Sequence, residues 1–463
     1  MLNPLILAGS TGASGYPDLP AASDMSTYGK RIQRSMGLMA TSTPTKRNTV
    51  RILYYGQSIV GQRWSEQVDA YLRDTYPHTN FVTANLALGG FSSPRLVRTL
   101  HYDALPFYPD LLVFHVYGSH VEYEEIIREI RSRTTAEVII QTDHANSWPG
   151  EQADSLDAQE AGADQTNYWH LPRIADAYGC ALQPQREEWT QYLTANGLEP
   201  SDLLTDSVHL NEHGKWLMAE LLQRFLRVLP EDEADEEFPH VDTYVVGRDV
   251  DWNDGVLTLP FDGNRVVAIA GPSAGGSATV TVDGEPPSTL PELYTFTRPT
   301  GTPHIGWPAV QKFTWESPPV LEEWTLSAHG FDDAHENFSF TVEGSVTGPD
   351  GGGTAREKFV SDSGRIVIEP EDWVFAFDRR VSEKPTPDGY QVTWAVRPLF
   401  ADTYTNPVVY DASVETETIL AQGLVNGPHT LQITATAARP DIRSIRVSRP
   451  TISPHVSPHG AHG

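Results

Sequence analysis

The pattern of apolar residues changes once along this chain of 463 residues, near residue 230, and this change constrains the fold more than any other feature. Between residues 51 and 229, short apolar runs alternate with stretches in which apolar residues recur every three or four positions, as in amphipathic helices. After residue 240 this spacing gives way to apolar–polar alternation with Asp-Gly and Asn-Gly turns. The sequence therefore predicts an α/β part followed by an all-β part.

Five apolar runs in the first part are expected to form strands. They cover residues 51–55, 80–88, 110–116, 136–142 and 180–184. The third run is apolar at nearly every position, which is typical of a parallel strand buried on both faces. The segments between the runs have helical faces, such as Trp64, Val68 and Leu72 at intervals of four residues. The alternation predicts an α/β domain over residues 50–230, with helices on both sides of a parallel sheet.

The two ends of the chain are expected to be loose. Residues 1–49 are predicted to be a tail followed by a packing helix, because Ile32, Met36 and Met39 have helical spacing. The apolar patch near the amino end has no basic residue before it and is a weak secretion signal. The protein is expected outside the cell or in the periplasm if that end is processed, and in the cytoplasm otherwise. Residues 451–463 are expected to form a flexible tail.

The second part is predicted to consist of β-sandwiches with a jelly-roll-like character. Residues 240–350 are expected to form one lobe, and residues 351–450 a second lobe or a continuation of the first. The acidic run at residues 230–239 begins with a proline and is expected to link the two parts of the chain.

Composition excludes some classes of partner and site. Acidic residues outnumber basic ones by 61 to 33, and a formal net charge of -28 repels nucleic acid and anionic membranes. No stretch approaches the roughly 20 apolar residues that a membrane helix needs. The single cysteine, Cys180, rules out an intrachain disulfide and a zinc site with several cysteines. We expect neither a nucleic acid nor a membrane as a partner.

Ser58 is the first candidate catalytic residue. It comes just after the first predicted strand, where a helix is expected to begin, and ligands bind at the carboxyl ends of strands in such sheets. The free N–H groups at a helix start would favour the oxyanion that forms when a serine attacks a carbonyl. A serine at this place is also an ordinary helix N-cap, so the stretch leaves both readings open.

Asp206 and His209 complete a second candidate stretch. They lie three residues apart, directly before the last helix of the α/β domain. A nucleophilic serine needs a base, and the base needs a carboxylate to orient it. Asp-x-x-His alone is often only a helix cap with a surface histidine. Together with Ser58 at the other end of the same domain, it favours a catalytic triad.

Three stretches of residues 50–229 resemble the blocks of the SGNH (GDSL-like) hydrolase family. The stretch "YYGQSIV" is similar to the first block in its Gly-Gln-Ser form, which is common in carbohydrate esterases, and implies Ser58 as the nucleophile. The stretch "NLALGGFSS" is similar to the second block and implies Gly90 as an oxyanion donor. The stretch "DSVHLNEHG" is similar to the last block and implies Asp206 and His209. The resemblance implies a flavodoxin-like three-layer α/β/α fold and a reaction without metal or cofactor.

The third block of the family departs from its usual pattern. Gly118 fits the expected Gly-x-Asn, but His120 stands where the asparagine is expected. An imidazole can donate a hydrogen bond, so His120 is a candidate third oxyanion donor beside the N–H groups of Ser58 and Gly90. The alternative is a histidine that caps the next helix.

Five further residues are candidates for binding the substrate. Asp143 and His144 end the fourth strand and are expected at the same crevice, where they would orient a sugar, bind a metal or act as an acid–base pair. Trp64 and Trp148 have aromatic faces on which a sugar ring would stack, although tryptophans are more often core residues. Gln57 precedes the nucleophile. For Asp143 and His144 the alternative is a role in hydrogen bonding within the loop.

The function that these observations favour is removal of an ester group, most simply O-acetyl, from a carbohydrate by a serine hydrolase. A carbohydrate or acylated glycan is the expected partner. One alternative is cleavage of a glycosidic bond by paired acid and base groups on the same scaffold. Another is a non-catalytic glycan-binding protein, because appended β-sandwiches often resemble carbohydrate-binding modules.

Overall fold

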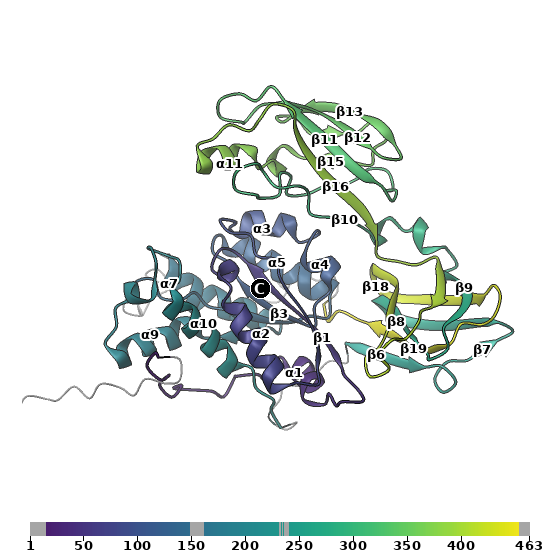
Figure 1. The fold of residues 1–463 in the computed structure, drawn as a ribbon, viewed down its shortest axis with the longest axis horizontal. Coiled ribbons are helices and arrows are strands. Elements are labelled where there is room, and N and C mark those ends of the chain that lie inside the picture. The colour runs from purple at the N-terminus through teal and green to yellow at the C-terminus, as the bar shows by residue number, and fades with distance from the viewer. Residues whose placement is uncertain (1–14, 149–161, 231–232, 234, 236–239, 453–463) are drawn as a thin grey trace, which may run out of the picture. The chain divides into compact units, whose positions relative to one another are not determined.

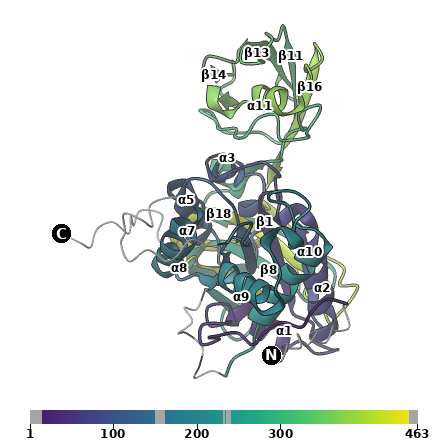
Figure 2. The ribbon, with the colours of Figure 1, turned by 90° about the vertical axis from the view of Figure 1, so that its left-hand side faces the viewer.

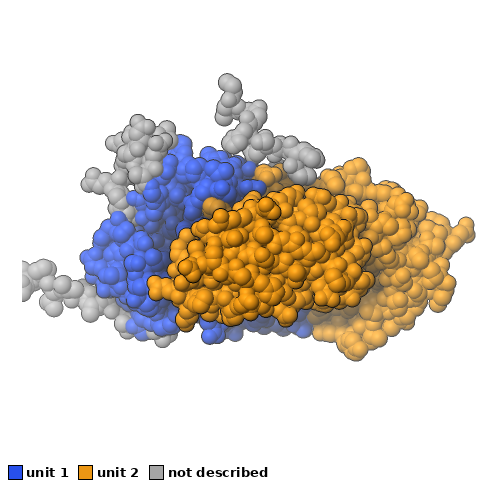
Figure 3. All heavy atoms as spheres, turned by 90° about the horizontal axis from the view of Figure 1, so that it is seen from above, with its two compact units in different colours: residues 1–92, 109–127, 136–237 blue, residues 93–108, 128–135, 238–463 orange. Residues whose placement is uncertain are grey.

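The computed structural model describes residues 15–148, 162–230, 233, 235 and 240–452. It divides into two compact units, coloured in Figure 3. Unit 1 comprises residues 1–92, 109–127 and 136–237, and unit 2 comprises residues 93–108, 128–135 and 238–463. Two short segments of the predicted α/β domain therefore cluster with the β part of the chain. The predicted linker at residues 230–239 and the two outermost tails lie largely outside the described residues.

Unit 1 contains a five-stranded parallel sheet in the order β2–β1–β3–β4–β5. The strands are β1 (Thr49–Gly56), β2 (Asn80–Asn85), β3 (Leu111–His115), β4 (Glu137–Gln141) and β5 (Ala181–Gln183). Each strand overlaps one of the five predicted apolar runs, so the parallel α/β arrangement is confirmed.

Helices cover both faces of this sheet. They are α1 (Gln33–Ala40), α2 (Trp64–Thr75), α5 (His120–Arg133), α7 (Ala163–Gln165), α8 (Leu171–Ala177), α9 (Gln185–Asn196) and α10 (Glu212–Phe225), with short helices η1 (Val60–Gln62), η2 (Thr166–His170) and η3 (Pro200–Leu203). Helix α1 lies in the region of the predicted packing helix. It contains Met36 and Met39, Ile32 is its N-cap, and all three side chains are buried. Among the described helices, none is both long and apolar enough to span a bilayer.

Side chains of β1 alternate between the two faces of the sheet. Ile52 and Tyr54 belong to a core that includes residues of α1, α2, α9 and α10. On the other face Tyr55 stacks on Phe114 of β3, whose ring meets Tyr123 of α5 edge-on at 5.0 Å. Helices α2 and α10 lie side by side in Figures 1 and 2. The sheet is therefore the middle layer of three, and the carboxyl end of β1 is held on both faces.

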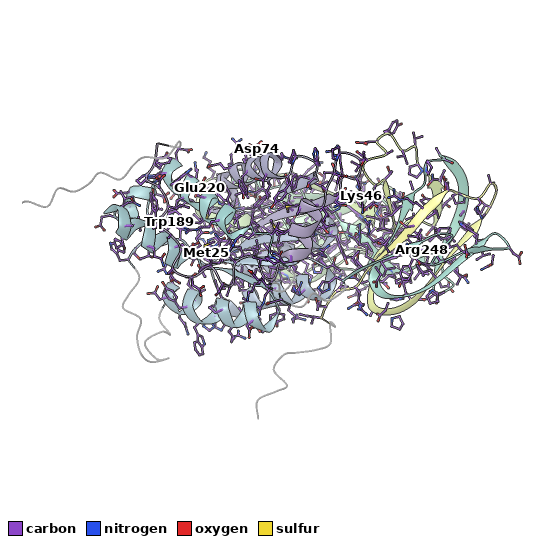
Figure 4. All side chains as sticks on the ribbon, turned by 90° about the horizontal axis from the view of Figure 1, so that it is seen from below. Met25, Lys46, Asp74, Trp189, Glu220 and Arg248 are labelled. Carbon is purple, nitrogen blue, oxygen red and sulfur yellow. The ribbon has the colours of Figure 1, made fainter. Side chains whose placement is uncertain are left out.

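Helix α9 is an element that the sequence pattern does not predict. Its buried residues include the polar Gln185, Arg186 and Glu188 as well as Trp189, which is labelled in Figure 4. Polar residues at buried positions break up the helical spacing of apolar residues on which a prediction depends. These buried polar residues have polar partners, as Glu188 has in Arg224, and such partners offset the cost of burial.

Gly56, the last residue of β1, leads into the stretch that contains Ser58. Its φ of +153° is a conformation that residues with a side chain rarely adopt, and a Cβ built on it would lie 1.9 Å from the carbonyl oxygen of His115. We expect Gly56→Ala to destabilise the protein by more than about 1 kcal/mol, because either the backbone of β1 or that of β3 has to move. The measurement is the urea midpoint of unfolding.

Gly37 is the matched control for that substitution. It lies in α1 with ordinary helical geometry, and a Cβ there meets nothing within 4 Å. Gly37→Ala is expected to raise stability by about 0.5–1 kcal/mol, since alanine is the better helix former. Equal urea midpoints for the two variants would contradict the steric account of Gly56.

Unit 2 contains two large antiparallel sheets. The first has the order β17–β9–β18–β8–β19–β6, with β7 paired to β8. Its strands are β6 (Val241–Val245), β7 (Trp252–Asn253), β8 (Val256–Ala270), β9 (Gly275–Val282), β17 (Thr403–Asn406), β18 (Glu417–Ala435) and β19 (Ile442–Ser448). The predicted all-β character is confirmed, and the sheet takes its strands from two distant parts of the chain.

The second sheet of unit 2 has the order β10–β16–β11–β12–β13. Its strands are β10 (Tyr294–Phe296), β11 (Glu323–His329), β12 (Ser339–Gly344), β13 (Gly348–Thr354) and β16 (Tyr390–Pro398), and a small pair is formed by β14 (Phe359–Val360) and β15 (Val367–Ile368). The unit also contains α3 (Ser93–Thr99), α4 (Ala104–Phe107), α11 (Phe375–Ser382), η4 (Pro287–Thr289), η5 (Pro291–Leu293) and η6 (Pro370–Asp372).

The predicted boundary between two consecutive lobes, at residues 350 and 351, is corrected by this topology. Both residues lie within β13, which pairs with β12. Residues 294–398 contribute the five strands of the second sheet and the separate pair of β14 and β15. Strands β8 and β18, which come before and after this segment in the chain, pair with each other in the first sheet. The apolar–polar pattern of a short strand is the same whichever strand it pairs with. The sequence pattern alone therefore assigns strands that are neighbours in the chain to the same lobe. Helix α11 is a further correction, since no helix is predicted in this part.

Candidate active site

Ser58 lies in the turn that follows β1. It is not a helix N-cap, because the N-cap of η1 is Ile59 and that of α2 is Arg63. The expected helix therefore begins six residues later than the serine, and only the three-residue η1 lies between them. Ser58 is presented on a tight turn at the carboxyl end of β1, and the carboxyl ends of the strands are where parallel α/β sheets bind ligands.

The structure brings Ser58, His209 and Asp206 together in one hydrogen-bonded chain. Ser58 Oγ lies 3.0 Å from His209 Nε2, and His209 Nδ1 lies 2.8 Å from Asp206 Oδ2. The serine and the other two residues are about 150 positions apart in sequence and meet because β1 and the start of α10 lie beside each other in unit 1. The serine, the histidine and the carboxylate have the hydrogen-bonded order that a serine hydrolase requires.

Asp206 is held as an anion by the turn that carries it. Its Oδ1 accepts hydrogen bonds from the backbone N–H groups of His209, at 2.7 Å, and Val208, at 2.8 Å. These bonds, and then the one with the His209 ring, lower the pKa of Asp206 to about 2. The carboxylate therefore stays charged at every pH at which an ester is ordinarily assayed, and the His209 ring keeps its Nδ1 directed toward it.

Two glutamines stabilise the turn that carries Ser58, and one of them also joins it to the turn that carries His209. Gln62, in η1, donates from Nε2 to the carbonyl of Leu210 and accepts from the Leu210 N–H, both at 2.9 Å. Gln57 is 3% exposed, and its Oε1 accepts from Ser58 Oγ and from the Ile59 N–H, both at 2.9 Å. This placement corrects the expectation that Gln57 contacts substrate, because its amide is buried under the turn and supports Ser58 from behind.

The second stretch of the resemblance lies beside Ser58. A Cβ built on Gly89 would be 3.5 Å from the Cβ of Ser58, and Gly90 follows with a φ of +81°. The carbonyl of Gly90 accepts from the Tyr117 hydroxyl at 3.2 Å. Within the described residues, the N–H groups of Ser58 and Gly90 donate to no protein acceptor. Both amides are therefore free for a ligand.

His120 is placed differently from the expectation. It begins α5, and its ring stacks on that of His170 with centroids 3.8 Å apart and planes 7° from parallel. The His170 pKa is lowered, first by burial and then by the nearby His120. An imidazole stacked in this way is held against η2, so we leave His120 out of the oxyanion site. No hydrogen bond joins it to Ser58 or Gly90 in the described part of the chain.

Asp143 and His144 make hydrogen bonds and close polar contacts within the protein instead of facing a ligand together. Asp143 Oδ1 lies 3.3 Å from His115 Nε2, and its Oδ2 accepts from the Asn167 amide at 3.2 Å. His144 is buried, and its Nε2 lies 2.9 Å from the carbonyl of Val208, within the turn that carries Asp206 and His209. In the residues that the structure describes, no three His, Cys, Asp or Glu side chains gather as ligands of one metal would.

The pKa of His144 is lowered by burial and then by the neighbouring His115, against the opposing effect of Asp143. As the pH falls, His144 therefore becomes protonated at a higher pH in the unfolded chain than in the folded protein. The contribution of His144 to stability is fully present above about pH 6.5 and is lost as the pH drops below that value.

We expect His144→Gln to reduce this acid sensitivity, because the glutamine amide can still donate to the Val208 carbonyl but does not titrate. The measurement is the melting temperature of both proteins between about pH 7 and pH 5. His78→Gln, at an exposed histidine, is the control and should follow the wild type. If His144→Gln loses as many degrees as the wild type over this range, His144 is not the group responsible.

The two candidate tryptophans differ in their exposure. Trp64 is fully buried at the start of α2, donates from Nε1 to the carbonyl of Ile59 and meets Tyr54 edge-on. It is a core residue, which corrects the expectation of a stacking platform. Trp148 is 43% exposed and donates from Nε1 to Glu199 Oε2 at 2.7 Å. Of the two, only Trp148 has a ring that a ligand can reach.

Sequence reasoning missed three residues that build the site. Gln62 and His115 carry no motif, and the partners that reveal their roles lie far away in the chain. Arg186 contacts the carbonyl of His144 and forms an ion pair with Asp164 at 2.8 Å, although it is a charged residue in a helix that was not predicted. No local signal marks them, because each acts through a contact between turns that only the folded sheet brings together.

Comparison with known proteins identifies similar solved structures only. No protein-family model matches the chain, and no curated protein matches it. A two-domain esterase, CEX, active on acetylated mannans, is 14% identical, with a TM-score of 0.35 and coverage of 91% of this chain and 95% of that one.

Smaller solved structures match a part of the chain. Axe2, an acetylxylan esterase from Geobacillus stearothermophilus, is 18% identical with a TM-score of 0.33, over 40% of this chain and 96% of that one. LAE5, an α/β hydrolase enzyme from the metagenome of Lake Arreo in Spain, is 17% identical with a TM-score of 0.33, over 40% and 98% of the two chains.

Proposed function

We propose that the protein is a serine esterase of SGNH type that removes acetyl groups from a carbohydrate. The observation that carries this proposal is the hydrogen-bonded chain from Ser58 through His209 to Asp206. The resemblance of the sequence to the SGNH blocks supports it independently, because it selects the same three residues from short motifs. The Gly-Gln-Ser form of the first block supports a carbohydrate ester as the substrate class.

In this reaction Ser58 Oγ attacks the carbonyl carbon of the ester while its proton passes to His209 Nε2. The tetrahedral intermediate then breaks its bond to the sugar oxygen, which leaves with that proton as the free hydroxyl. Water attacks the acetyl-serine in the same way, releases acetate and returns the proton to Ser58. Asp206 holds the Nδ1–H of His209, so that Nε2 is the nitrogen that accepts.

The hydroxyl of Ser58 has one hydrogen and two acceptors within reach. These are Gln57 Oε1 at 2.9 Å and His209 Nε2 at 3.0 Å. The Ile59 N–H donates to the same Gln57 oxygen, which identifies that atom as the oxygen and not the nitrogen of the amide. Gln57 therefore holds the hydroxyl between substrates, and attack requires the hydrogen to turn toward His209.

The free N–H groups of Ser58 and Gly90 are the oxyanion donors in this proposal. Donors at such a site act most strongly when they are fixed before the reaction begins. Gly90 is held by the hydrogen bond from Tyr117 to its carbonyl, and Ser58 by the turn over Gln57. Two backbone donors suffice to form an oxyanion hole, so the site does not depend on His120.

The experiment that tests the proposal measures two products from the same reaction. Acetylated xylan and acetylated mannan, the substrates of the similar solved esterases, are incubated with the full chain, and both acetate and new reducing ends are quantified. We expect acetate without new reducing ends, and hydrolysis of p-nitrophenyl acetate. New reducing ends without acetate would overturn the proposal in favour of glycosidic cleavage. Glycan binding without either product would overturn it in favour of a binding protein.

A further inference from the structure

Unit 2 contains a cavity of about 300 Å³ that the proposed reaction does not use. This volume lies within the range of small-ligand pockets. Part of its wall is aromatic, formed by Tyr294, Phe296, Phe313 and Trp315. An apolar wall with a few polar groups converging on it is the usual composition of a site that binds a small molecule.

The charged residues of this cavity are Arg133, Lys312 and Glu292. Within the described residues Lys312 is half-buried and lies within ion-pair distance of no carboxylate, and Glu292 likewise lacks a cationic partner. Arg133 has only a long contact of 3.7 Å with Glu129. Acidic residues exceed basic ones by almost two to one in the whole chain. The lining of the cavity, with two cations and one carboxylate, therefore has a net positive charge, whereas the net charge of the whole chain is negative.

His101 adds a neutral polar group to the same cavity. Burial and then the charges of Arg133 and Lys312 lower its pKa to about 3, so the imidazole is uncharged at neutral pH. A neutral imidazole has one N–H donor and one acceptor. The ring has no hydrogen-bond partner within the part of the chain that the structure describes. His101, Arg133 and Lys312 line the same cavity, which places the three polar groups around one space.

We propose that this cavity binds an acidic sugar, a uronate residue of a saccharide. Its carboxylate pairs with Lys312 and Arg133, and its hydroxyl groups bond to Glu292 and to the His101 imidazole. The apolar face of the sugar ring packs on the aromatic wall at Trp315. Such a ligand can pair with the two cations and with the carboxylate of Glu292 at the same time, because its ring carries one anionic group and several neutral hydroxyl donors. The inference rests on the proposed function only for the class of ligand, a carbohydrate.

The test is calorimetric titration of the full chain with sodium glucuronate at low ionic strength, where an ion pair contributes most. Glucose, which has the ring without the charge, and acetate, which has the charge without the ring, are the reference ligands. We expect glucuronate to bind at least about ten-fold more tightly than either, the effect of one charge-assisted hydrogen bond. Equal affinity for glucose would overturn the role of the cations, and equal affinity for acetate would overturn that of the ring.

Variants show whether the binding belongs to this cavity. Lys312→Met, which keeps the chain length and removes the charge, is expected to weaken glucuronate binding about ten-fold or more, whereas Lys312→Arg retains it. Lys384→Met, at an exposed lysine of the same unit, is the matched control. Circular dichroism spectra establish that the variants fold. Unchanged glucuronate binding by folded Lys312→Met would overturn the assignment to this site, as would no detectable binding by the wild type.

Glucuronate binding and acetate release are measured separately, so the cavity and the proposed esterase function are tested independently. Ser58→Ala is expected to bind glucuronate as the wild type does, because Ser58 lies in unit 1 and does not line the cavity. Acetate release without glucuronate binding would leave the esterase proposal standing and overturn the cavity alone. Glucuronate binding without acetate release would do the reverse.

Discussion

Ser58→Ala is expected to lower kcat for ester hydrolysis by about 10⁴-fold or more, because the attacking oxygen is removed and no other nucleophile stands next to His209. The residual rate should come from water activated by His209 near the free N–H groups of Ser58 and Gly90. KM should change little, since the hydroxyl contributes to the transition state more than to binding. The measurement is the initial rate of acetate release with wild type and variant at saturating substrate.

The control for this substitution is Ser201→Ala, which removes an exposed hydroxyl elsewhere in unit 1. It should hydrolyse the ester at the wild-type rate. A second observation separates loss of chemistry from loss of the fold. The Ser58 side chain packs over the Gln57 amide, so the melting temperature of Ser58→Ala should remain close to that of the wild type. If Ser58→Ala keeps its full activity, the nucleophile is not Ser58, and the chain from Ser58 to Asp206 serves another purpose.

Asp206→Asn is expected to lower kcat by about 10²- to 10⁴-fold through the tautomer of His209. The backbone N–H groups of Val208 and His209 hold Oδ1, so the asparagine keeps its oxygen there and turns its NH₂ toward His209 Nδ1. A ring that accepts at Nδ1 carries its hydrogen at Nε2 and cannot take the proton of Ser58. The Asp206 side chain is 55% exposed, and solvent screening favours the lower end of this range over the value for a buried carboxylate.

The profile of rate against pH tests the same assignment. The pKa of Asp206 lies near 2, so a loss of wild-type activity at mildly acidic pH would not come from protonation of Asp206. Asp74→Asn, at an exposed position on α2 that is labelled in Figure 4, is the control and should leave rate and profile unchanged. A wild-type rate for Asp206→Asn would show that the backbone alone orients the His209 ring.

The two outer stretches of the resemblance predicted the candidate triad, whereas the surrounding support was not predictable from them. Ser58 lies two residues after a glycine that only the strand end accommodates, and Asp206 and His209 lie three residues apart on one turn. Such spacing involves residues that are close together in the chain, so it can be recognised from the sequence alone. The roles of Gln62 and His144 depend on contacts with Leu210 and Val208, more than 60 positions away in each case. Nothing in their own neighbourhood distinguishes them from ordinary loop residues.

The structure places Gln57, Trp64 and His120 differently from the expectations. Trp64 and Gln57 are expected at a ligand because they lie close to Ser58 in sequence and, for Trp64, because its aromatic face can stack on a sugar ring. In the structure both side chains turn inward, because the turn after β1 needs a buried amide to hold its N–H groups and an indole to fill the space below α2. His120 is expected at the oxyanion because of its position in a motif, yet its ring stacks on that of His170 in η2.

Sequence by itself determined the class of the first part, the order of its strands along the chain and the three residues of the candidate triad, because periodicity and short motifs are local properties. Only the tertiary structure decided which strands of the β part are neighbours, since β8 and β18 pair across about 150 intervening residues. It also decided which polar residues are buried and which amides are free, and it formed the cavity around His101 and Lys312. These are properties of contacts between distant segments, and their energies are set only when the chain has folded.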